Sequence, residues 1–319
     1  MTVAWVIGGN GLLGTALRRT LPHRCTHLFT PAERFCWHDR SRLNQQLELA
    51  VKEFSTLVGT GNKWHIYWAA GIGTMNSTKA ELATETQTLS TVLGLIESEP
   101  DLVADEGYFA FASSAGAIYA GATDDIITEK TAVAPTTAYA REKLKQEELI
   151  SAFTRKNSGL TALHARISTL YGPGQTNGKQ QGLLAHIARC IIKNQSVHIY
   201  VPFDTIRDYI TTNDAASLIV ASLCSLSDKT GVYTKIIASE KPATIAEIIS
   251  VFKRIARRRP RIVSSTSKLS SLYTRRIQFR SITVPTNEAL SKTSLLIGIA
   301  QVMAAERLAF SQTGNLTKP

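Results

Sequence analysis

Short apolar runs alternate with longer stretches of mixed polarity along the first half of the chain. The apolar runs predict buried strands, because a strand covered on both faces carries apolar side chains almost continuously. We expect strands at residues 3–7, 27–30, 64–69, 108–112 and 159–166, and helices at 15–21, 79–97 and 137–153. Strands that alternate with helices predict right-handed crossovers and a parallel sheet with helices on both faces. The pattern therefore indicates a doubly wound α/β fold.

The pattern is less regular after Tyr171. Residues 172–179 combine glycine, proline and polar side chains, which is typical of a loop. Further helices are expected at 183–193, 213–226 and 245–256. We expect a larger domain formed by residues 1–172 together with a returning segment at about 203–236. A smaller C-terminal α/β domain would consist of residues 173–202 and 237–319.

A glycine-rich turn joins the first expected strand to the first expected helix. Gly8, Gly9, Gly11 and Gly14 satisfy both the G-x-G-x-x-G and the G-x-x-G-x-x-G spacings. Such glycines allow a tight turn, a close approach of the backbone to a pyrophosphate, and close packing of the helix on the sheet. Because the turn lies between a strand and a helix, we expect it to bind a dinucleotide. A glycine turn with a purely structural role is the alternative.

The end of the second expected strand bears on which dinucleotide binds. An acidic side chain at that position would hold the ribose hydroxyls of NAD. The chain instead has Thr30 near this position, with Glu33 and Arg34 just beyond it. A small neutral residue followed by an arginine suits the 2′-phosphate of NADP, so we expect NADP. NAD is the alternative, with Glu33 in the acidic role and Arg34 in solvent.

A tyrosine and a lysine one helical turn apart provide candidate acid–base chemistry. Tyr139 and Lys143 occupy positions i and i+4 of an expected helix, so both project from one face. A lysine cation close to a tyrosine lowers the pKa of the phenol, which can then exchange a proton near neutral pH. Ser113 and Ser114 end the preceding strand, at the sheet edge where ligands bind in this class of fold. A hydroxyl there can hydrogen-bond a substrate oxygen.

Composition places this chain of 319 residues, with 44% hydrophobic and 19% charged residues, among ordinary globular proteins. No apolar run approaches the roughly 18 residues that span a bilayer. The first residues lack the basic head of a secretory signal. Cys25, Cys36, Cys190 and Cys224 show no metal-ligand spacing, which is typical of thiols in a reducing compartment. We therefore expect a cytoplasmic protein without a metal or a membrane partner.

The charge balance is basic, because 36 Lys and Arg residues against 25 Asp and Glu residues give a net charge of +11. The densest basic run lies at the end of an expected helix and consists of Lys253, Arg254, Arg257, Arg258, Arg259 and Arg261. Such a helix end is usually solvated, and a patch that contacts phosphate is the alternative. No helix-turn-helix, zinc-finger or RNP-type pattern accompanies the run, so nucleic acid is not the expected partner.

Several segments together resemble the extended short-chain dehydrogenase/reductase family, the NAD(P)-dependent epimerase/dehydratase group. In the family's order, residues 8–14 resemble its cofactor loop, 69–71 the segment after its fourth strand, and 111–119 its catalytic serine segment. Residues 139 and 143 match its catalytic pair, 166–174 its arginine and Tyr-Gly-Pro stretch, and 207–216 its returning segment. The resemblance implies a Rossmann-type fold. It also implies cofactor contacts, beside that of Arg34, from Gly8, Gly11, Leu12, Leu13, Gly14, Ala69, Ala70, Gly71, Tyr139 and Lys143.

The resemblance also assigns roles in a reaction. Tyr139 would be the acid–base residue, and Lys143 would hold the nicotinamide ribose. Ser114 would bind the reacting oxygen, with Ser113 as the other candidate. Arg207 would meet the diphosphate of a nucleotide-sugar substrate, and a salt bridge to Asp208 or to another neighbour is its alternative role. The substrate would lie in the cleft between the two domains, and a homodimer is the family expectation.

Three departures from the family pattern bear on the reaction. Ala115 and Gly116 follow Ser114 where the family's dehydratases carry Asp-Glu, which argues against sugar 4,6-dehydration. Epimerases often carry an asparagine just before the Tyr-Gly-Pro stretch, where this chain has Thr169-Leu170, and Thr211 replaces the usual histidine. Both changes weaken the expectation of a standard epimerase pocket. An epimerase and a keto-reductase of a nucleotide sugar remain the two main hypotheses. A reductase of another carbonyl compound and a non-catalytic dinucleotide-sensing protein are further alternatives.

Overall fold

The computed structural model describes residues 1–25, 27–71, 73–75, 77–174, 182–264, 276–286 and 290–315. Its centre is a six-stranded parallel sheet formed by β1 (Thr2–Ile7), β2 (His27–Phe29), β3 (Lys63–Trp68), β4 (Gly107–Ser114), β5 (Leu160–Ile167) and β10 (Gly231–Ile237). The strands lie in the order β10-β5-β4-β3-β1-β2, and each neighbouring pair is parallel. The chain winds outward from β1 to β2 and then continues with β3 on the other side of β1. This arrangement confirms the doubly wound fold that the sequence predicts.

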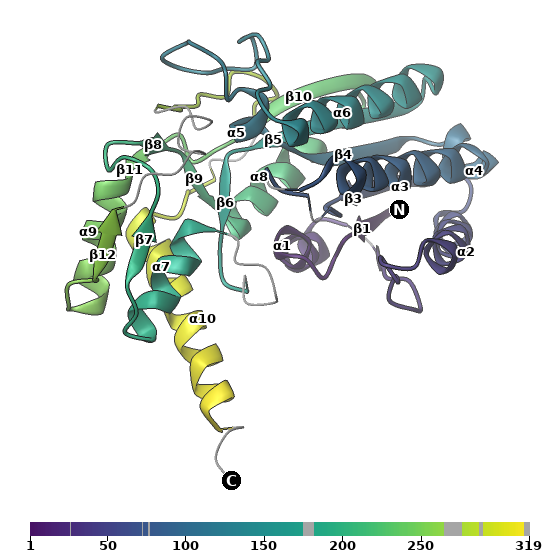
Figure 1. The fold of residues 1–319 in the computed structure, drawn as a ribbon. Helices are drawn as coiled ribbons and strands as arrows, with labels where there is room; N and C mark the ends of the chain where they lie inside the picture. The colour runs from purple at the N-terminus through teal and green to yellow at the C-terminus, as the bar shows by residue number, and fades with distance from the viewer. Residues whose placement is uncertain are drawn as a thin grey trace.

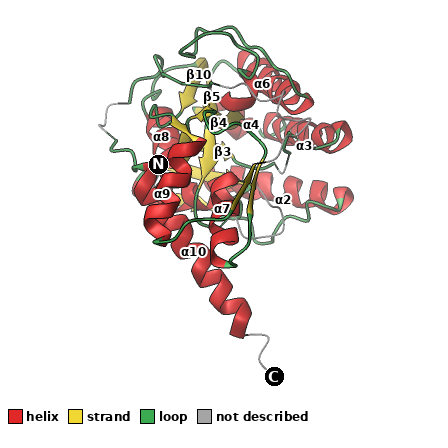
Figure 2. Ribbon diagram, turned by 60° about the vertical axis from the view of Figure 1, so that its left-hand side comes forward, coloured by secondary structure: helices red, strands yellow, loops and turns green. Residues whose placement is uncertain are grey.

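Helices cover both faces of the sheet because side chains alternate along each strand. In β1, Trp5 and Ile7 face one side, whereas Ala4 and Val6 face the other. The first side packs against α2 (Arg40–Val58), α3 (Lys79–Glu97), α4 (Pro100–Ala104) and α6 (Ala138–Lys156). The second side packs against α1 (Leu12–Thr20) and α8 (Thr212–Cys224). Figure 1 and Figure 2 show the strands enclosed between these two layers of helices.

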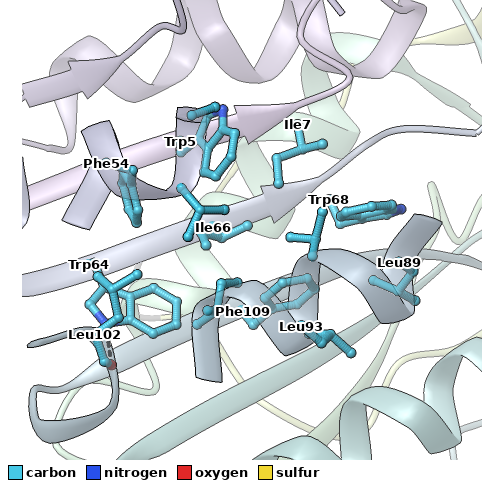
Figure 3. Packing of buried hydrophobic residues seen from close by; sticks show 14 of the residues in the cluster. Trp5, Ile7, Phe54, Trp64, Ile66, Trp68, Leu89, Leu93, Leu102 and Phe109 are labelled. Carbon is cyan, nitrogen blue, oxygen red and sulfur yellow. Dashed lines mark hydrogen bonds between the residues drawn. The ribbon is translucent and has the colours of Figure 1, made fainter. Parts of the chain in front are cut away.

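Aromatic side chains fill the core beneath α2, α3 and α4 (Figure 3). The ring centroids of Trp5 and Phe54 are 5.4 Å apart, and those of Phe54 and Trp64 are 6.4 Å apart. The buried Nε1 of Trp64 donates to the carbonyl of Leu102 at 2.9 Å. Because a buried donor that keeps its hydrogen bond avoids a desolvation penalty, this large indole is accommodated in the core. The cluster fixes β1, β3 and β4, and with them the loops that follow these strands.

A second group of elements surrounds its own apolar cluster. It comprises α7 (Leu183–Ile192), β7 (Val197–Ile199), α9 (Ile245–Ala256), β12 (Ile262–Ser264) and α10 (Leu295–Asn315). Ile187 of α7, Phe252 of α9 and Val302 of α10 are buried in it. Two further strand pairs are β6 (Thr169–Tyr171) with β9 (Tyr209–Thr211), and β8 (Ile206–Arg207) with β11 (Ala243–Thr244). The distal part of α10 extends away from the rest of the molecule (Figure 1).

The elements differ from the expected ones in a few places. The helix expected from residue 15 already begins at Leu12, directly after the glycine turn, and β4 extends through Ser114. The sequence analysis did not anticipate the strand β10 or the helices α2, α4 and α10, nor the short helix α5 (Ala115–Ile118) and the 3₁₀ turn η1 (Leu21–His23). Of the loop expected at 172–179, residues 172–174 are described and residues 175–179 lie outside the described residues.

The basic run lies at the end of α9, as expected. Lys253 and Arg254 occupy its last turn, and Arg257 follows with a left-handed φ of 53°. The side chains of these residues and of Arg258, Arg259 and Arg261 are exposed. In the described ranges, none of the helices is both long enough and apolar enough to cross a bilayer.

Candidate active site

The turn from β1 to α1 lies at the carboxyl edge of the sheet, where the winding reverses. Gly8 has a φ of 86°, and a Cβ added there would lie 2.5 Å from the amide nitrogen of Ala70. A Cβ at Gly14 would overlap the carbonyl of Gly8. The amide of Gly11 donates to that carbonyl at 3.0 Å, and Gly11 is the N-cap of α1. The start of α1 is therefore held on a turn in which glycines occupy the closely packed positions, a geometry that fits a pyrophosphate.

The other residues expected at this turn take different positions. Leu13 is buried and packs in the cluster between α1 and α8, whereas Leu12 is half-buried at the start of the helix. Ala69 and Ala70 are half-buried in the loop after β3, and Gly71 is exposed. Leu13 therefore anchors the start of α1 in the core, and the loop after β3 lies directly beside the glycine turn.

The loop after β2 carries Arg34 on its exposed surface. Gln46 of α2 holds this loop, because its Nε2 donates to the Glu33 carboxylate at 3.1 Å and to the Arg34 carbonyl at 3.0 Å. The Oε1 of Gln46 accepts from the amide of Cys36 at 2.8 Å. The carboxylate of Glu33 also lies 3.7 Å from the guanidinium of Arg42. The acidic group near this edge is thus engaged by α2, while Arg34 faces solvent.

The two serines at the end of β4 point to opposite sides of the strand, as strand geometry requires. The hydroxyl of Ser114 hydrogen-bonds the phenol of Tyr139. The hydroxyl of Ser113 is buried and donates to the carboxylate of Glu147 at 2.6 Å. The expectation that Ser113 binds substrate does not fit this placement, which leaves Ser114 as the candidate for the reacting oxygen.

Tyr139 and Lys143 lie on the first two turns of α6, which begins where the Thr137 hydroxyl accepts from the amide of Ala140. Lys143 is buried, and its ammonium donates to Oε1 of Gln146 at 3.0 Å. It also lies 4.9 Å from the centre of the Phe111 ring and 5.9 Å from that of the Tyr139 ring. Lys143 thus lies beside the phenol, on the helix face that the sequence predicts.

The pKa of Tyr139 differs from the expectation. We expected Lys143 to lower it, but burial and then the negative charge of Glu85 raise the pKa of Tyr139 to about 12, against the hydrogen bond from Ser114. The reason is that the ammonium of Lys143 is directed to Gln146 and not to the phenol oxygen. Burial in turn lowers the pKa of Lys143. Near neutral pH the phenol is therefore protonated and able to donate.

A buried ion pair fixes the same face of α6 one turn further along. Glu147 lies four residues after Lys143, and its two oxygens accept from Arg166 of β5 at 3.0 and 2.7 Å. Arg166 also donates to the hydroxyl of Tyr119 at 2.5 Å. Sequence reasoning used Arg166 only as part of the resemblance and missed Glu147. The i, i+4, i+8 spacing of Tyr139, Lys143 and Glu147 was the available signal.

Arg207 lies on β8, half-buried, and its Nη1 donates to the carbonyl of Ile206 at 2.8 Å. Asp208 is buried and accepts from the hydroxyl of Ser168 at 2.7 Å and from the amide and hydroxyl of Ser239 at 2.8 and 2.9 Å. The carboxylate of Asp208 is therefore occupied by serines of two other segments.

Comparisons with known proteins agree with this geometry. The sequence pattern of the NAD dependent epimerase/dehydratase family matches residues 4–233. The dTDP-4-dehydro-6-deoxyglucose reductase of Escherichia coli is 31% identical over 116 residues, which is 36% of this chain and 35% of that protein. The dTDP-L-rhamnose 4-epimerase of Burkholderia thailandensis is 28% identical over 96 residues, 30% of this chain and 26% of that protein. The chain thus spans about a quarter to a third of the length of these curated relatives.

Solved structures show the same fold over nearly the whole chain. RMD from Pseudomonas aeruginosa, complexed with NADPH, superposes with a TM-score of 0.77 at 19% identity, covering 97% of this chain and 100% of that one. The UDP-glucose 4-epimerase of Thermus thermophilus, in complex with NAD, gives a TM-score of 0.73 at 18% identity, with 96% and 99% covered. Because the family pattern spans most of the sequence, the chain belongs to the NAD-dependent epimerase/dehydratase family.

Proposed function

We propose that this chain transfers a hydride at a carbinol or ketone carbon of a nucleotide sugar, as a keto-reductase or an epimerase that uses NADP. The hydrogen-bonded pair of Ser114 and Tyr139, at the sheet edge where the glycine turn also lies, carries the proposal. Reduction is the direction we favour, because the phenol of Tyr139 is protonated near neutral pH.

A nicotinamide dinucleotide, when bound, supplies or accepts the hydride. The residues present fit such a cofactor, because Gly8, Gly11 and Gly14 keep side chains away from the start of α1. Arg34 is the group that would meet the 2′-phosphate of NADP, since Glu33 is engaged by Gln46 of α2. Lys143 would hold the nicotinamide ribose.

The side chains of the chain itself handle the proton. The hydroxyl of Ser114 would hold the carbonyl oxygen of the sugar next to the phenol of Tyr139. Tyr139 would donate its proton to that oxygen as the ketone becomes an alcohol, which leaves the phenol as a phenolate. The ammonium of Lys143 lies 5.9 Å from the centre of the Tyr139 ring and would stabilise the phenolate if it turned from Gln146 toward the phenol oxygen. An epimerase would run this step in both directions on opposite faces of one ketone.

The relatives support a nucleotide-sugar substrate. The curated relatives are a reductase and an epimerase of dTDP-linked sugars by name. Arg207, on β8 in the returning segment, is the group that we assign to the substrate diphosphate, because a guanidinium recognises phosphate oxygens through paired hydrogen bonds.

The test is a screen of the purified chain against dTDP-, UDP- and GDP-linked 4-keto sugars and sugars, each with NADPH and with NADH. A reductase consumes one reduced nicotinamide per product, whereas an epimerase interconverts two sugars without net consumption. Tyr139→Phe serves as the control for chemistry at this site. Tight cofactor binding without turnover of any sugar would instead favour a dinucleotide-sensing protein. Turnover of simple carbonyl compounds alone would favour the reductase of a different substrate class.

A further inference from the structure

Glu85 of α3 reaches into the loop that follows β3, close to the candidate active site. One oxygen of its half-buried carboxylate accepts from the amide of Gly73 at 2.5 Å. A Cβ added at Gly71 would lie 3.1 Å from the second oxygen, and one at Gly73 would lie 3.0 Å from it. The carboxylate therefore rests against a loop backbone that carries no side chains at these two points, so the loop leaves room for the charge.

The charge of Glu85 acts on both members of the candidate catalytic pair. Thr86, the residue after Glu85 on α3, accepts from Nε2 of Gln146 at 3.0 Å, and Oε1 of the same Gln146 accepts from the ammonium of Lys143 at 3.0 Å, so this part of α3 lies against the pair on α6. The charge of Glu85 raises the pKa of Tyr139, and it also raises the pKa of Lys143, against the lowering by burial. Both effects follow from Coulomb attraction and repulsion in a partly desolvated site.

Glu147 of α6 also acts on Lys143, and further titratable groups surround Glu147. They are His164 and Arg166 on β5, and Tyr119 after α5. Glu147 and Arg166 offset each other in a bidentate ion pair, with oxygen to nitrogen distances of 2.7 and 3.0 Å. Burial lowers the pKa of His164 and raises that of Tyr119, so both are neutral near pH 7. Within the described part of the chain, Glu85 is thus the charged neighbour whose effect favours the phenol of Tyr139 over its phenolate.

We propose that Glu85 is a positioning residue of the reaction centre, whose carboxylate beside α6 favours the protonated forms of Tyr139 and Lys143 and thereby favours reduction of a ketone over oxidation of an alcohol. The inference rests on the proposed function for its catalytic meaning. No step is assigned to Glu85 itself, because it acts through Tyr139 and Lys143.

The test separates charge from structure at this position. Glu85→Gln keeps an oxygen that can accept from the Gly73 amide but removes the charge, whereas Glu85→Asp keeps the charge. Glu48→Gln is the matched control, because Glu48 is an exposed carboxylate on α2 whose partner is Lys52. Should the amide variant fold poorly, Glu85→Ala carries the same expectation for the charge.

Two readouts are compared in all variants. The first is the ionisation of Tyr139 in isotope-labelled protein with NADP⁺ bound, followed by NMR over the neutral to alkaline range and assigned by its loss in Tyr139→Phe. The second is the pH profile of kcat/KM for reduction. We expect Glu85→Gln to move the ionisation of Tyr139 and the alkaline limb of the profile downward by on the order of 1 pH unit. Glu85→Asp and Glu48→Gln should keep both near the wild-type position.

The outcomes distinguish this inference from the proposed function. An unchanged ionisation of Tyr139 in Glu85→Gln overturns the inference, whatever the activity. A downward shift without turnover of any sugar supports the role of Glu85 and rejects the proposed function. Turnover that keeps its pH profile in Glu85→Gln supports the proposed function and rejects the inference.

Discussion

Arg166→Met should destabilise the protein strongly, because it leaves the carboxylate of Glu147 buried without its cation. The side chains of Arg166 and Glu147 are 10% and 6% exposed. The guanidinium donates to both oxygens of Glu147 and to the hydroxyl of Tyr119. Methionine fills similar space but donates no hydrogen bond. Of the donors Arg166 and Ser113, the carboxylate of Glu147 then retains only the hydroxyl of Ser113. Removing one partner of a buried ion pair costs about 3–5 kcal/mol.

The assay is thermal unfolding of a double-mutant cycle that combines Arg166→Met with Glu147→Leu. At about 2–3 °C per kcal/mol for a chain of this size, each single variant should melt roughly 6–15 °C below the wild type. The double variant should recover most of this loss, because neither charge then remains buried alone. Arg155→Met is the control, since it breaks an exposed pair with Glu148 that is worth about 0–1 kcal/mol. A double variant that melts no higher than the worse single variant would refute the assignment.

Four further outcomes follow from the site and the core. Tyr139→Phe should lower turnover by on the order of 10²-fold or more while cofactor affinity, measured by fluorescence, stays nearly unchanged; near wild-type turnover would contradict its role. Ser114→Ala should lower kcat, whereas Ser113→Ala should chiefly lower the melting temperature, and the reverse pattern would exchange their roles. Arg34→Ala should weaken NADPH binding by about tenfold and leave NADH binding unchanged in calorimetry, and an equal loss for both cofactors would argue against a 2′-phosphate contact. Burial lowers the pKa of His65 to about 4 from 6.5, so about 3 kcal/mol of stability present above pH 6.5 should be lost as the pH falls to about 4. His65→Phe should flatten this pH dependence of the unfolding free energy in denaturant titrations. An equally steep dependence in the variant would show that other groups cause it.

Five strands of the central sheet were predictable because they are continuous apolar runs. The sixth, β10, was not among the expected strands, and Thr234 and Lys235 interrupt its apolar run. The missed helix α2 also carries a signal, since Leu43, Leu47 and Phe54 follow a helical spacing among polar residues. The missed helix α10 carries almost none. Val302 and Met303 are buried, whereas Leu308 and Phe310 are exposed, so its apolar side chains do not mark one face.

The site was predictable where chemistry follows local spacing. Tyr139 and Lys143 are neighbours on one helix, and the position of Ser114 follows from the end of a strand. The sequence could not decide between Ser113 and Ser114. Side chains alternate along a strand, so the two serines face opposite sides of the sheet, but the sequence does not show on which side Glu147 lies. The influence of Glu85 on Tyr139 was also hidden, because it depends on the packing of α3 beside α6.

The position of β10 at the edge of the sheet has a consequence for synthesis of the chain. β5 is buried along its whole length, yet its partner on one side consists of residues 231–237, which pair with residues 161–167. After β5 has left the ribosome, about 70 further residues must therefore follow before β10 can cover this edge of the sheet. Until then the open edge can pair with other chains, so fragments that stop before β10 should aggregate and depend on chaperones.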